Sequence, residues 1–344
     1  MQYNGCVMLE LNVKSRSPAA ITAAIKRVQE MVMTDAVSRS IPIHITLEAG
    51  TYREVIRYNL ANPLVIEAAP GVRAEDCIIQ ADNCEAFRRG LVARSVFAIG
   101  ANATNVTMRN FSIINTHNKS LTEGSTLRDS AEAFVWNSMS GSLFAERMRF
   151  SGRQNTLYVR GNAWFLNCYV EGDTDFVYGE PETALFENCR LHLREDNRGD
   201  FDGYAVNSRV KADKQGFVFL GSRFTGEARQ AGQLYVYRTS GLGSAASGKD
   251  WDSMALINCM VSDVYSGQLV WDDDMELNIF PRGNARTGIR EYNTRTVTAG
   301  GSVEEADTSR RNIKSYTLTD EDYFSSYASR YLILRNTPFA QNLE

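Results

Sequence analysis

Leu166-Asn167-Cys168-Tyr169-Val170 is the stretch that decides the fold, because related stretches recur through the middle of the chain. Three copies carry an Asn-Cys pair, and three end in a small or acidic residue followed by glycine, at Ser151-Gly152, Glu171-Gly172 and Thr225-Gly226. The copies are Met108-Arg109-Asn110-Phe111-Ser112-Ile113, Glu146-Arg147-Met148-Arg149-Phe150, Glu187-Asn188-Cys189-Arg190-Leu191, Gly221-Ser222-Arg223-Phe224 and Ile257-Asn258-Cys259-Met260-Val261. Arg147, Asn167 and Asn188 follow one another at steps of 20 and 21 residues. A period near 20 built from short strands predicts a β-solenoid, whose coils bury their apolar faces against each other.

Two other architectures fit the sequence poorly. Leucine-rich repeats have a similar period, but their dense Leu-x-x-Leu-x-Leu signature is absent. Doubly wound α/β folds need a helix between strands, and almost no segment with helical periodicity lies between residues 95 and 265. We therefore expect an all-β solenoid with long loops inserted on one side.

Helices are expected only near the ends of the chain. Ser17-Pro18 resembles an N-cap followed by proline at the first helical position. Ile21, Ile25 and Val28 then mark one apolar face of a helix over about residues 17–34, which we expect to cover the open end of the solenoid. A loop and short-helix region is expected over about 280–344, with a helix that starts at Thr319-Asp320-Glu321-Asp322. With only seven prolines and no Gly/Ser tract, residues 1–344 are interpreted as a single domain.

Composition excludes several classes of protein. The chain is 43% hydrophobic and 23% charged with a net charge of −4, which argues against a nucleic-acid partner. That charge also means that local basic residues must hold any acidic polymer. No apolar stretch of about 18 residues occurs, so no membrane-spanning helix is expected. Met1–Cys6 lacks the pattern of a signal peptide, so a secreted form would have lost its signal before this sequence begins.

Six cysteines are present, and their spacing matches no zinc framework. Only Cys77 and Cys84 are close enough in the sequence to suggest a local disulfide. Cys168 and Cys189 occupy equivalent positions of the repeat, so we expect them to stack in the core as small hydrophobic residues.

Residues 152–179 carry a resemblance to a known family: GRQNTLYVRGNAWFLNCYVEGDTDFVYG. This stretch resembles the central signature of pectin methylesterases, which is Gln-Asp-Thr-Leu-Tyr, one coil, and then Asp-Phe-Ile-Phe-Gly. Ala49-Gly50-Thr51-Tyr52-Arg53-Glu54 is similar to the family's Pro-Gly-x-Tyr-x-Glu motif, and the end of its "Thr-Phe-x-Asn-Thr" strand is similar to Phe111 with Asn115-Thr116. Gly216-Phe217-Val218-Phe219 resembles the strand before the family's catalytic arginine, and Arg238 falls where that arginine belongs. The resemblance covers residues 45 to about 325.

The resemblance implies a right-handed parallel β-helix that hydrolyses methyl esters of polygalacturonate and releases methanol, without a metal or another cofactor. It assigns Asp175 as the nucleophile, Gln154 as a donor to the oxyanion and Arg238 as the partner of Asp175. A coil of about 20 residues returns the chain one strand spacing away, about 4.8 Å, so positions 155 and 175 should lie side by side. The resemblance also implies a pectin or oligogalacturonide partner, a secreted or cell-envelope location, and a monomer without nucleic-acid or membrane partners.

The sequence departs from the family pattern at the acid/base aspartate, which is Asn155 here. An amide cannot give and take a proton at neutral pH. The family's second oxyanion glutamine falls on Glu132, and the tryptophan two residues after the arginine is Ser240. Three explanations of Asn155 stay open: an engineered substitution, natural divergence with Glu132 supplying a carboxyl, and a chain that binds polysaccharide without turnover. Our hypothesis is that Glu132 partly replaces the acid/base.

Several aromatic and acidic residues have two interpretations. Tyr158, Phe176 and Trp271 are candidates for stacking on sugar rings, although aromatic residues in a β-helix also pack in ladders. Trp271 is the candidate to replace the missing tryptophan. Asp272-Asp273-Asp274 with Glu276 suggests calcium, but a solvated acidic loop is the preferred interpretation, and no metal is expected.

Two rival functions remain. A pectate-lyase-like enzyme would cleave the polymer by elimination with calcium, and a non-catalytic solenoid would bind the glycan without releasing methanol. Unsaturated product at 235 nm would indicate the lyase. Binding of oligogalacturonide without methanol release, even after Asn155→Asp, would indicate the binding protein.

Overall fold

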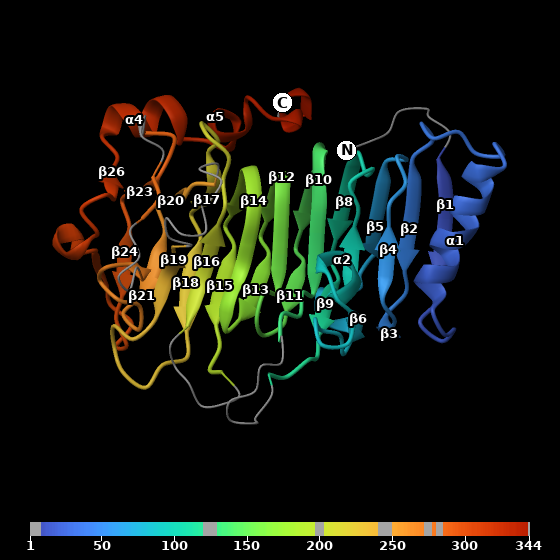
Figure 1. Ribbon diagram of the computed structural model, residues 1–344, viewed down its shortest axis with the longest axis horizontal. Helices are drawn as coiled ribbons and strands as arrows, with labels where there is room; N and C mark the ends of the chain where they lie inside the picture. Colours follow the sequence, from blue (N-terminus) through green and yellow to red (C-terminus); the bar gives the residue numbers. More distant parts are fainter. Residues whose placement is uncertain are drawn as a thin grey trace.

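The computed structural model describes residues 8–119, 129–196, 203–239, 250–271, 277–279 and 285–342. Its strands wind into a right-handed parallel β-helix whose coils follow one another along the long axis of the molecule (Figure 1). The predicted fold class is therefore confirmed. Within the described residues, the strands form two sheets that share the coils between them.

The larger sheet has 16 strands. They are β1 (Leu9–Val13), β2 (Ile43–Leu47), β4 (Ile56–Tyr58), β5 (Leu64–Ala68), β7 (Phe97–Ile99), β8 (Asn105–Arg109), β10 (Phe134–Glu146), β12 (Leu157–Leu166), β14 (Thr174–Glu187), β16 (Tyr204–Ser208), β17 (Gly216–Leu220), β19 (Tyr235–Arg238), β20 (Met254–Ile257), β22 (Val270–Trp271), β23 (Ile289–Tyr292) and β26 (Tyr316–Thr317).

The smaller sheet has 10 strands. They are β3 (Gly50–Arg53), β6 (Cys77–Ala81), β9 (Ser112–Asn115), β11 (Arg149–Ser151), β13 (Tyr169–Gly172), β15 (Arg190–Leu193), β18 (Arg223–Gly226), β21 (Met260–Ser262), β24 (Arg295–Val297) and β25 (Val303–Glu305). Apart from the antiparallel pair β24 and β25, the strand pairs in both sheets are parallel.

The repeat found in the sequence forms the turn between the two sheets. One residue of each turn has a positive φ, and these residues are Asn110 (59°), Arg147 (51°), Asn167 (55°), Asn188 (52°), Gly221 (60°), Asn258 (53°) and Asn293 (49°). The left-handed conformation is favourable for Gly and is tolerated better by Asn than by most other residues. Asn recurs in the repeat because the backbone needs this conformation at this turn in successive coils.

The cysteine of the repeat lies in the core directly after that turn. Cys168 and Cys189 are 2% exposed and Cys259 is fully buried. Each thiol donates to a carbonyl one coil earlier, at 3.4 Å from Cys168 to Ala145, 3.4 Å from Cys189 to Phe165 and 3.3 Å from Cys259 to Phe219. Burial raises the pKa of Cys259 to about 12, which suits a packing role. The stacked core thiols are confirmed, whereas the local disulfide considered for Cys77 and Cys84 is wrong because both thiols are free.

Aromatic rings fill the same interior. Phe165 and Phe186 occupy paired positions of β12 and β14 and stack face to face, with ring centroids 4.4 Å apart and an interplanar angle of 14°. Phe134 and Phe150 lie 5.4 Å apart one coil earlier. Aromatic contacts of this kind add to the free energy gained by burial.

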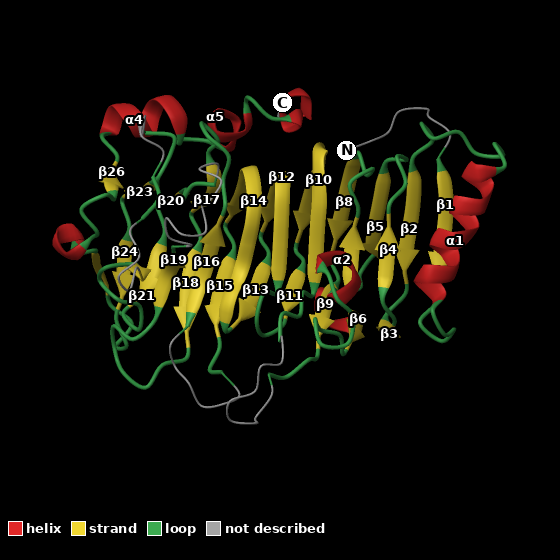
Figure 2. Ribbon diagram, in the orientation of Figure 1, coloured by secondary structure: helices red, strands yellow, loops and turns green. Residues whose placement is uncertain are grey.

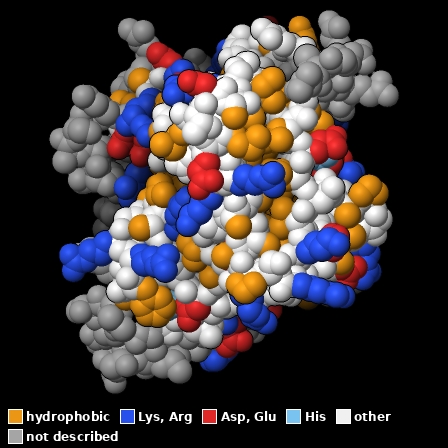
Figure 3. Space-filling model, turned by 90° about the vertical axis from the view of Figure 1, so that its right-hand side faces the viewer, with side chains coloured by type: hydrophobic (Ala, Val, Ile, Leu, Met, Phe, Trp, Pro, Cys, Tyr) orange, Lys and Arg blue, Asp and Glu red, His pale blue; other side chains and the backbone are white. Residues whose placement is uncertain are grey.

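Helix α1 (Ala20–Met33) covers the first coil, as expected, and its apolar face buries Ile21, Ile25, Val28 and Val32. Figure 2 shows it across one end of the solenoid, and Figure 3 shows that this end carries charged side chains of both signs among hydrophobic ones. The predicted cap at Ser17-Pro18 is wrong, because the helix begins after Ala19, which makes no side-chain cap. Glu54 takes that role: its carboxylate accepts from the N–H groups of Ile21 (3.0 Å) and Thr22 (2.8 Å).

The C-terminal region is more regular than predicted. Strands β23, β24 and β26 extend the solenoid into the stretch expected to be loops and short helices, since Tyr292-Asn293 repeats the turn of the earlier coils. The other helical elements in the described part of the chain are α2 (Leu91–Arg94), α4 (Asp320–Ser326), α5 (Arg330–Leu334), η1 (Ala74–Asp76), η2 (Thr308–Arg310) and η3 (Pro338–Asn342). The start of α4 is confirmed, with a capping box between Thr319 and Asp322. Among the described residues, no helix is long and apolar enough to cross a membrane.

Candidate active site

Three successive coils bring Ala131, Asn155 and Asp175 to the same corner of the solenoid. The N–H of Ala131 donates to the carbonyl of Gln154 at 3.2 Å, and the N–H of Asn155 donates to the carbonyl of Thr174 at 3.0 Å. Because equivalent bonds link successive coils, the three residues form one row across the starts of β10, β12 and β14. The spacing of 20 residues between positions 155 and 175 thus produces the neighbours that the sequence predicted.

Asp175 lies in a tight turn at the start of β14. Its φ is 45° and its side chain is 8% exposed. A side chain at Gly172 would lie 2.4 Å from the Cβ of Phe176 and 2.6 Å from the carbonyl of Arg153, so the turn closes only with glycine there. Burial raises the pKa of the Asp175 carboxyl, while the positive charges of Arg238, Arg209 and Lys119 act in the opposite direction.

Arg238 at the end of β19 binds both oxygens of the Asp175 carboxylate. Its Nε lies 3.1 Å from Oδ1, and its Nη2 contacts Oδ2. This two-point contact fixes the orientation of the carboxylate and favours its ionised form. The guanidinium in turn lies over the ring of Tyr204, with 5.2 Å from Cζ to the ring centroid. In the backbone register, Trp271 of β22 is the direct neighbour of Arg238.

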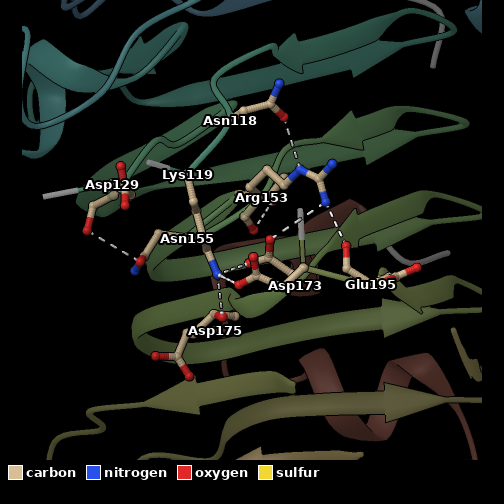
Figure 4. A network of polar contacts seen from close by, with 12 residues as sticks. Asn118, Lys119, Asp129, Arg153, Asn155, Asp173, Asp175 and Glu195 are labelled. Atoms are coloured by element: carbon tan, nitrogen blue, oxygen red, sulfur yellow. Dashed lines mark hydrogen bonds and ion pairs between the residues drawn. The ribbon is translucent and has the colours of Figure 1, made fainter. Parts of the chain in front are cut away.

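A buried lysine lies behind Asp175 (Figure 4). Lys119 Nζ is 2.6 Å from Asp173 Oδ1 and 2.7 Å from Asp196 Oδ2, and it donates to Thr174 Oγ1 at 2.9 Å. The side chains of Lys119 and Asp173 are each 1% exposed. Arg153 approaches the other oxygen of Asp173 at 3.9 Å. These charges compensate each other and fix the turn that carries Asp175.

Asn155 also has a positive φ, 66°, and its side chain is half-buried beside the Asp175 coil. Its Oδ1 accepts from the hydroxyl of Ser130 at 3.5 Å. In Figure 4 the amide end of Asn155 points toward the carboxyl of Asp129. Gln154, the predicted oxyanion donor, pairs through its backbone with Thr174 and is half-buried at the same corner.

Glu132 is fully buried, and its carboxylate is held by two other groups. Arg94 Nε lies 3.1 Å from Oε1 and 2.8 Å from Oε2, and Arg94 Nη2 lies 2.6 Å from Oε1. The hydroxyl of Tyr178 also donates to Oε1. Burial and the charge of Glu132 raise the pKa of the Tyr178 hydroxyl well above its usual value, so it stays protonated as a donor. Both oxygens of Glu132 therefore have strong donors from the protein itself.

The three aromatic candidates differ in their surroundings. Phe176 is fully buried in the main core, so its predicted stacking on a sugar ring is wrong; the side chain points inward from the turn. Tyr158 is 7% exposed and packs edge-to-face on Tyr178 at 5.1 Å between centroids, with its hydroxyl 3.4 Å from Glu180. The side chain of Trp271 lies outside the described residues, as do Ser240, Asp272-Asp273-Asp274 and Glu276.

Sequence reasoning missed Lys119 and Asp129. Lys119 and Asp129 flank residues 120–128 in a stretch that matches no motif, and only the fold brings them to the Asp175 corner. The sequence did hold one signal for Lys119. Asp173 and Asp175 lie two residues apart, and two carboxylates this close need a cation nearby if they are buried. Within the described part of the chain, no group of three or more His, Cys, Asp or Glu residues has the arrangement of a metal site.

Comparisons with known proteins show which family and fold the chain shares. The family model described as Pectinesterase matches residues 16–320. Putative pectinesterase 11 from Arabidopsis thaliana is 42% identical over 66 residues, which are 19% of this chain and 18% of the relative. The first three curated relatives are matched over 18%, 28% and 65% of their own length.

Two solved structures share the fold along most of the chain. Pectin methylesterase PemA from Erwinia chrysanthemi has a TM-score of 0.70 at 20% identity and covers 96% of this chain and 98% of its own. A pectin methylesterase in complex with a hexasaccharide has a TM-score of 0.69 at 20% identity, with the same coverage of 96% and 98%.

Proposed function

The chain belongs to the pectinesterase family, and we propose that it hydrolyses methyl esters of polygalacturonate and releases methanol. The observation that carries this proposal is the buried Asp175 carboxylate, which Arg238 holds through both oxygens one coil away from Asn155. A carboxylate fixed in this way is prepared to attack an ester carbonyl, because its orientation is set before substrate arrives.

In the proposed first step, an ionised oxygen of Asp175 attacks the carbonyl carbon of the methyl ester. The bond to methoxide breaks, the methoxide takes a proton and leaves as methanol, and the sugar acid stays bound to Asp175 as an anhydride. Water then attacks this anhydride and gives up a proton, which regenerates Asp175 and the free galacturonate. The side-chain amide of Gln154 is the proposed donor to the oxyanion of both steps.

Positively charged side chains near Asp175 suit the binding of an acidic polymer. Arg238, Arg209 and Lys119 all act on Asp175, although the whole chain has a net charge of −4. We assign the attraction of galacturonate carboxylates to Arg238 and Arg209, whose side chains reach solvent, because Asp173 and Asp196 already compensate the buried charge of Lys119. A solved relative holds a hexasaccharide, which supports an oligogalacturonide ligand here. Tyr158 and Trp271 remain the proposed aromatic contacts to sugar.

Methanol release from methylated pectin tests this function. We expect the unaltered chain to release methanol without added calcium and to form no product that absorbs at 235 nm. Formation of that unsaturated product would favour the lyase instead. Asn155 gives a specific reason to test a non-catalytic glycan-binding function as well. Binding of oligogalacturonide with no methanol release, from either the unaltered chain or Asn155→Asp, would establish that alternative.

The family also supports a secreted or cell-envelope location, which we propose together with a monomeric state. Fractionation of cells that make the full native protein tests the location. Light scattering coupled to size-exclusion chromatography tests the oligomeric state, with the mass of one chain as the expected result.

A further inference from the structure

The proposed reaction needs a group that gives one proton to methoxide and later takes one from water. Asn155 occupies the family position for this group, and an amide does not perform that exchange. Glu132 is poorly suited to replace it, because Arg94 and Tyr178 hold its two oxygens in a fully buried network. The proton must therefore pass through another side chain at the same corner.

Asp129 is a carboxylate at that corner. It directly precedes Ser130, whose hydroxyl lies 3.5 Å from Asn155 Oδ1, and Ala131, which bonds to the Asn155 coil. Figure 4 shows the Asp129 carboxyl facing the amide end of Asn155, on the same side of the coils as Asp175. The Asp129 side chain is 11% exposed, so it retains some access to solvent and substrate, unlike the fully buried Glu132.

A histidine supports Asp129 from behind. His117 Nε2 lies 3.4 Å from Asp129 Oδ1, and His117 Nδ1 lies 3.0 Å from Asp82 Oδ1. The backbone N–H of His117 donates to Asn115 Oδ1 at 3.1 Å, which fixes the residue to β9. A histidine between two carboxylates orients the one that faces the reaction, as second-layer partners do in other acid/base sites.

We propose that Asp129 is the catalytic acid/base of this chain and performs the proton transfers that position 155 performs in the family pattern. This inference rests on the proposed ester hydrolysis. Protonated Asp129 gives its proton to the departing methoxide, which leaves as methanol while the anhydride with Asp175 forms. Ionised Asp129 then takes a proton from the water that cleaves the anhydride, so Asp129 ends the cycle protonated and Asp175 ionised. Asn155 becomes a neutral neighbour that holds the reacting water or alcohol oxygen by its amide.

The test compares five variants, one of them Asn155→Asp alone, with the unaltered chain in methanol release from methylated oligogalacturonide. Asp129→Asn should lower kcat/KM by about 100-fold or more, which is the usual contribution of a general acid/base. Asp129→Asn combined with Asn155→Asp should recover activity to within about tenfold of the unaltered chain, because the carboxyl returns to the family position. A purely structural role for Asp129 would not give this rescue.

Two matched variants complete the test. Asp76→Asn is the control: Asp76 lies in η1 and pairs with Arg73, with 48% of its side chain exposed, and its replacement should change activity less than about threefold. Glu132→Gln tests the rival hypothesis that Glu132, and not Asp129, is the acid/base. Each variant's melting curve is recorded, so that loss of fold is recognised.

The outcomes are distinguishable. Full activity of Asp129→Asn would overturn the assignment of Asp129. So would a loss of about 100-fold in a folded Glu132→Gln variant. Neither result would contradict the proposed ester hydrolysis. If the double variant is folded and stays inactive although Asn155→Asp alone is active, the assignment is likewise overturned. If neither the unaltered chain nor Asn155→Asp releases methanol, the proposed function itself fails.

Discussion

Residues with positive φ occupy two corners of the coil, and the two corners differ in what their side chains do. At the turn between the sheets, Asn167 and Asn188 have a φ of 55° and 52° and expose their side chains. At the start of the long strands, Asn155 and Asp175 have a φ of 66° and 45°, and Asp175 is buried among charged groups. The backbone conformation is the same, but the Asp175 side chain is buried against Arg238, whereas the side chains of Asn167 and Asn188 reach solvent.

Within one coil, the residues of one corner therefore serve packing and those of the other corner serve the proposed chemistry. At the turn corner the left-handed residue serves the backbone, and the cysteine after it fills the core. At the site corner the left-handed turn aims a carboxylate at Arg238, and a buried lysine compensates the remaining charge. Substitutions at the two corners should therefore affect different properties of the protein, which the following predictions test.

The largest expected effect is on stability, from Lys119→Met. Removal of the buried cation leaves Asp173 and Asp196 without their shared partner, so the free energy of unfolding should fall by about 3–5 kcal/mol. Lys211→Met is the matched control, because Lys211 pairs with Asp250 with 47% of its side chain exposed. The control should lose less than about 1 kcal/mol. Urea unfolding measures both, and equal losses would contradict the compensating role of Lys119.

Arg238→Gln should lower kcat/KM by about 100-fold, since the nucleophile loses its orienting partner. Burial already raises the pKa of Asp175, and Arg238 opposes that rise. Activity requires the ionised carboxylate, so it is lost as pH falls through this pKa. Without the arginine the pKa rises further, and the acid limb of the pH profile should move to higher pH. An unmoved acid limb would count against the pair; Arg223→Gln, exposed on the smaller sheet, is the control.

The smallest effect is expected at the turn corner. Asn188→Ala should lower the free energy of unfolding by about 1 kcal/mol, because alanine is strained in the left-handed conformation. Asn188→Gly should be close to neutral, since glycine adopts this conformation readily. Thermal unfolding compares the two variants, and methanol release should stay unchanged in both. Equal stability of the two variants would show that the conformation does not explain the repeated Asn.

The sequence predicted the turn corner better than the site corner. Asn167 and Asn188 repeat because every coil has the same backbone need, so periodicity alone located them. Asp175 and Arg238 were found through the family resemblance, and their contact required two coils to be stacked. That residues 1–344 form a single domain stays a prediction.

Other features depended on contacts between distant residues. Lys119 meets Asp173 and Asp196 across 54 and 77 positions of the chain, which no local pattern encodes. Phe176 was misjudged because an aromatic residue beside a catalytic position looks the same in the sequence whether it points inward or outward. The helix cap was misjudged for the same reason: Glu54, 33 residues beyond Ile21, supplies the acceptor that Ser17 was expected to provide.

The most direct test of the central claim is methanol release from a methylated oligogalacturonide by the unaltered chain, Asp175→Asn and Asn188→Gly, measured side by side. We expect the unaltered chain and Asn188→Gly to release methanol at similar rates. Asp175→Asn, folded with a comparable melting curve, should be slower by about 1,000-fold or more, because the amide is not a nucleophile. Retention of activity by Asp175→Asn, or an equal loss in both variants, would contradict the claim that the chemistry resides at the Asp175 corner.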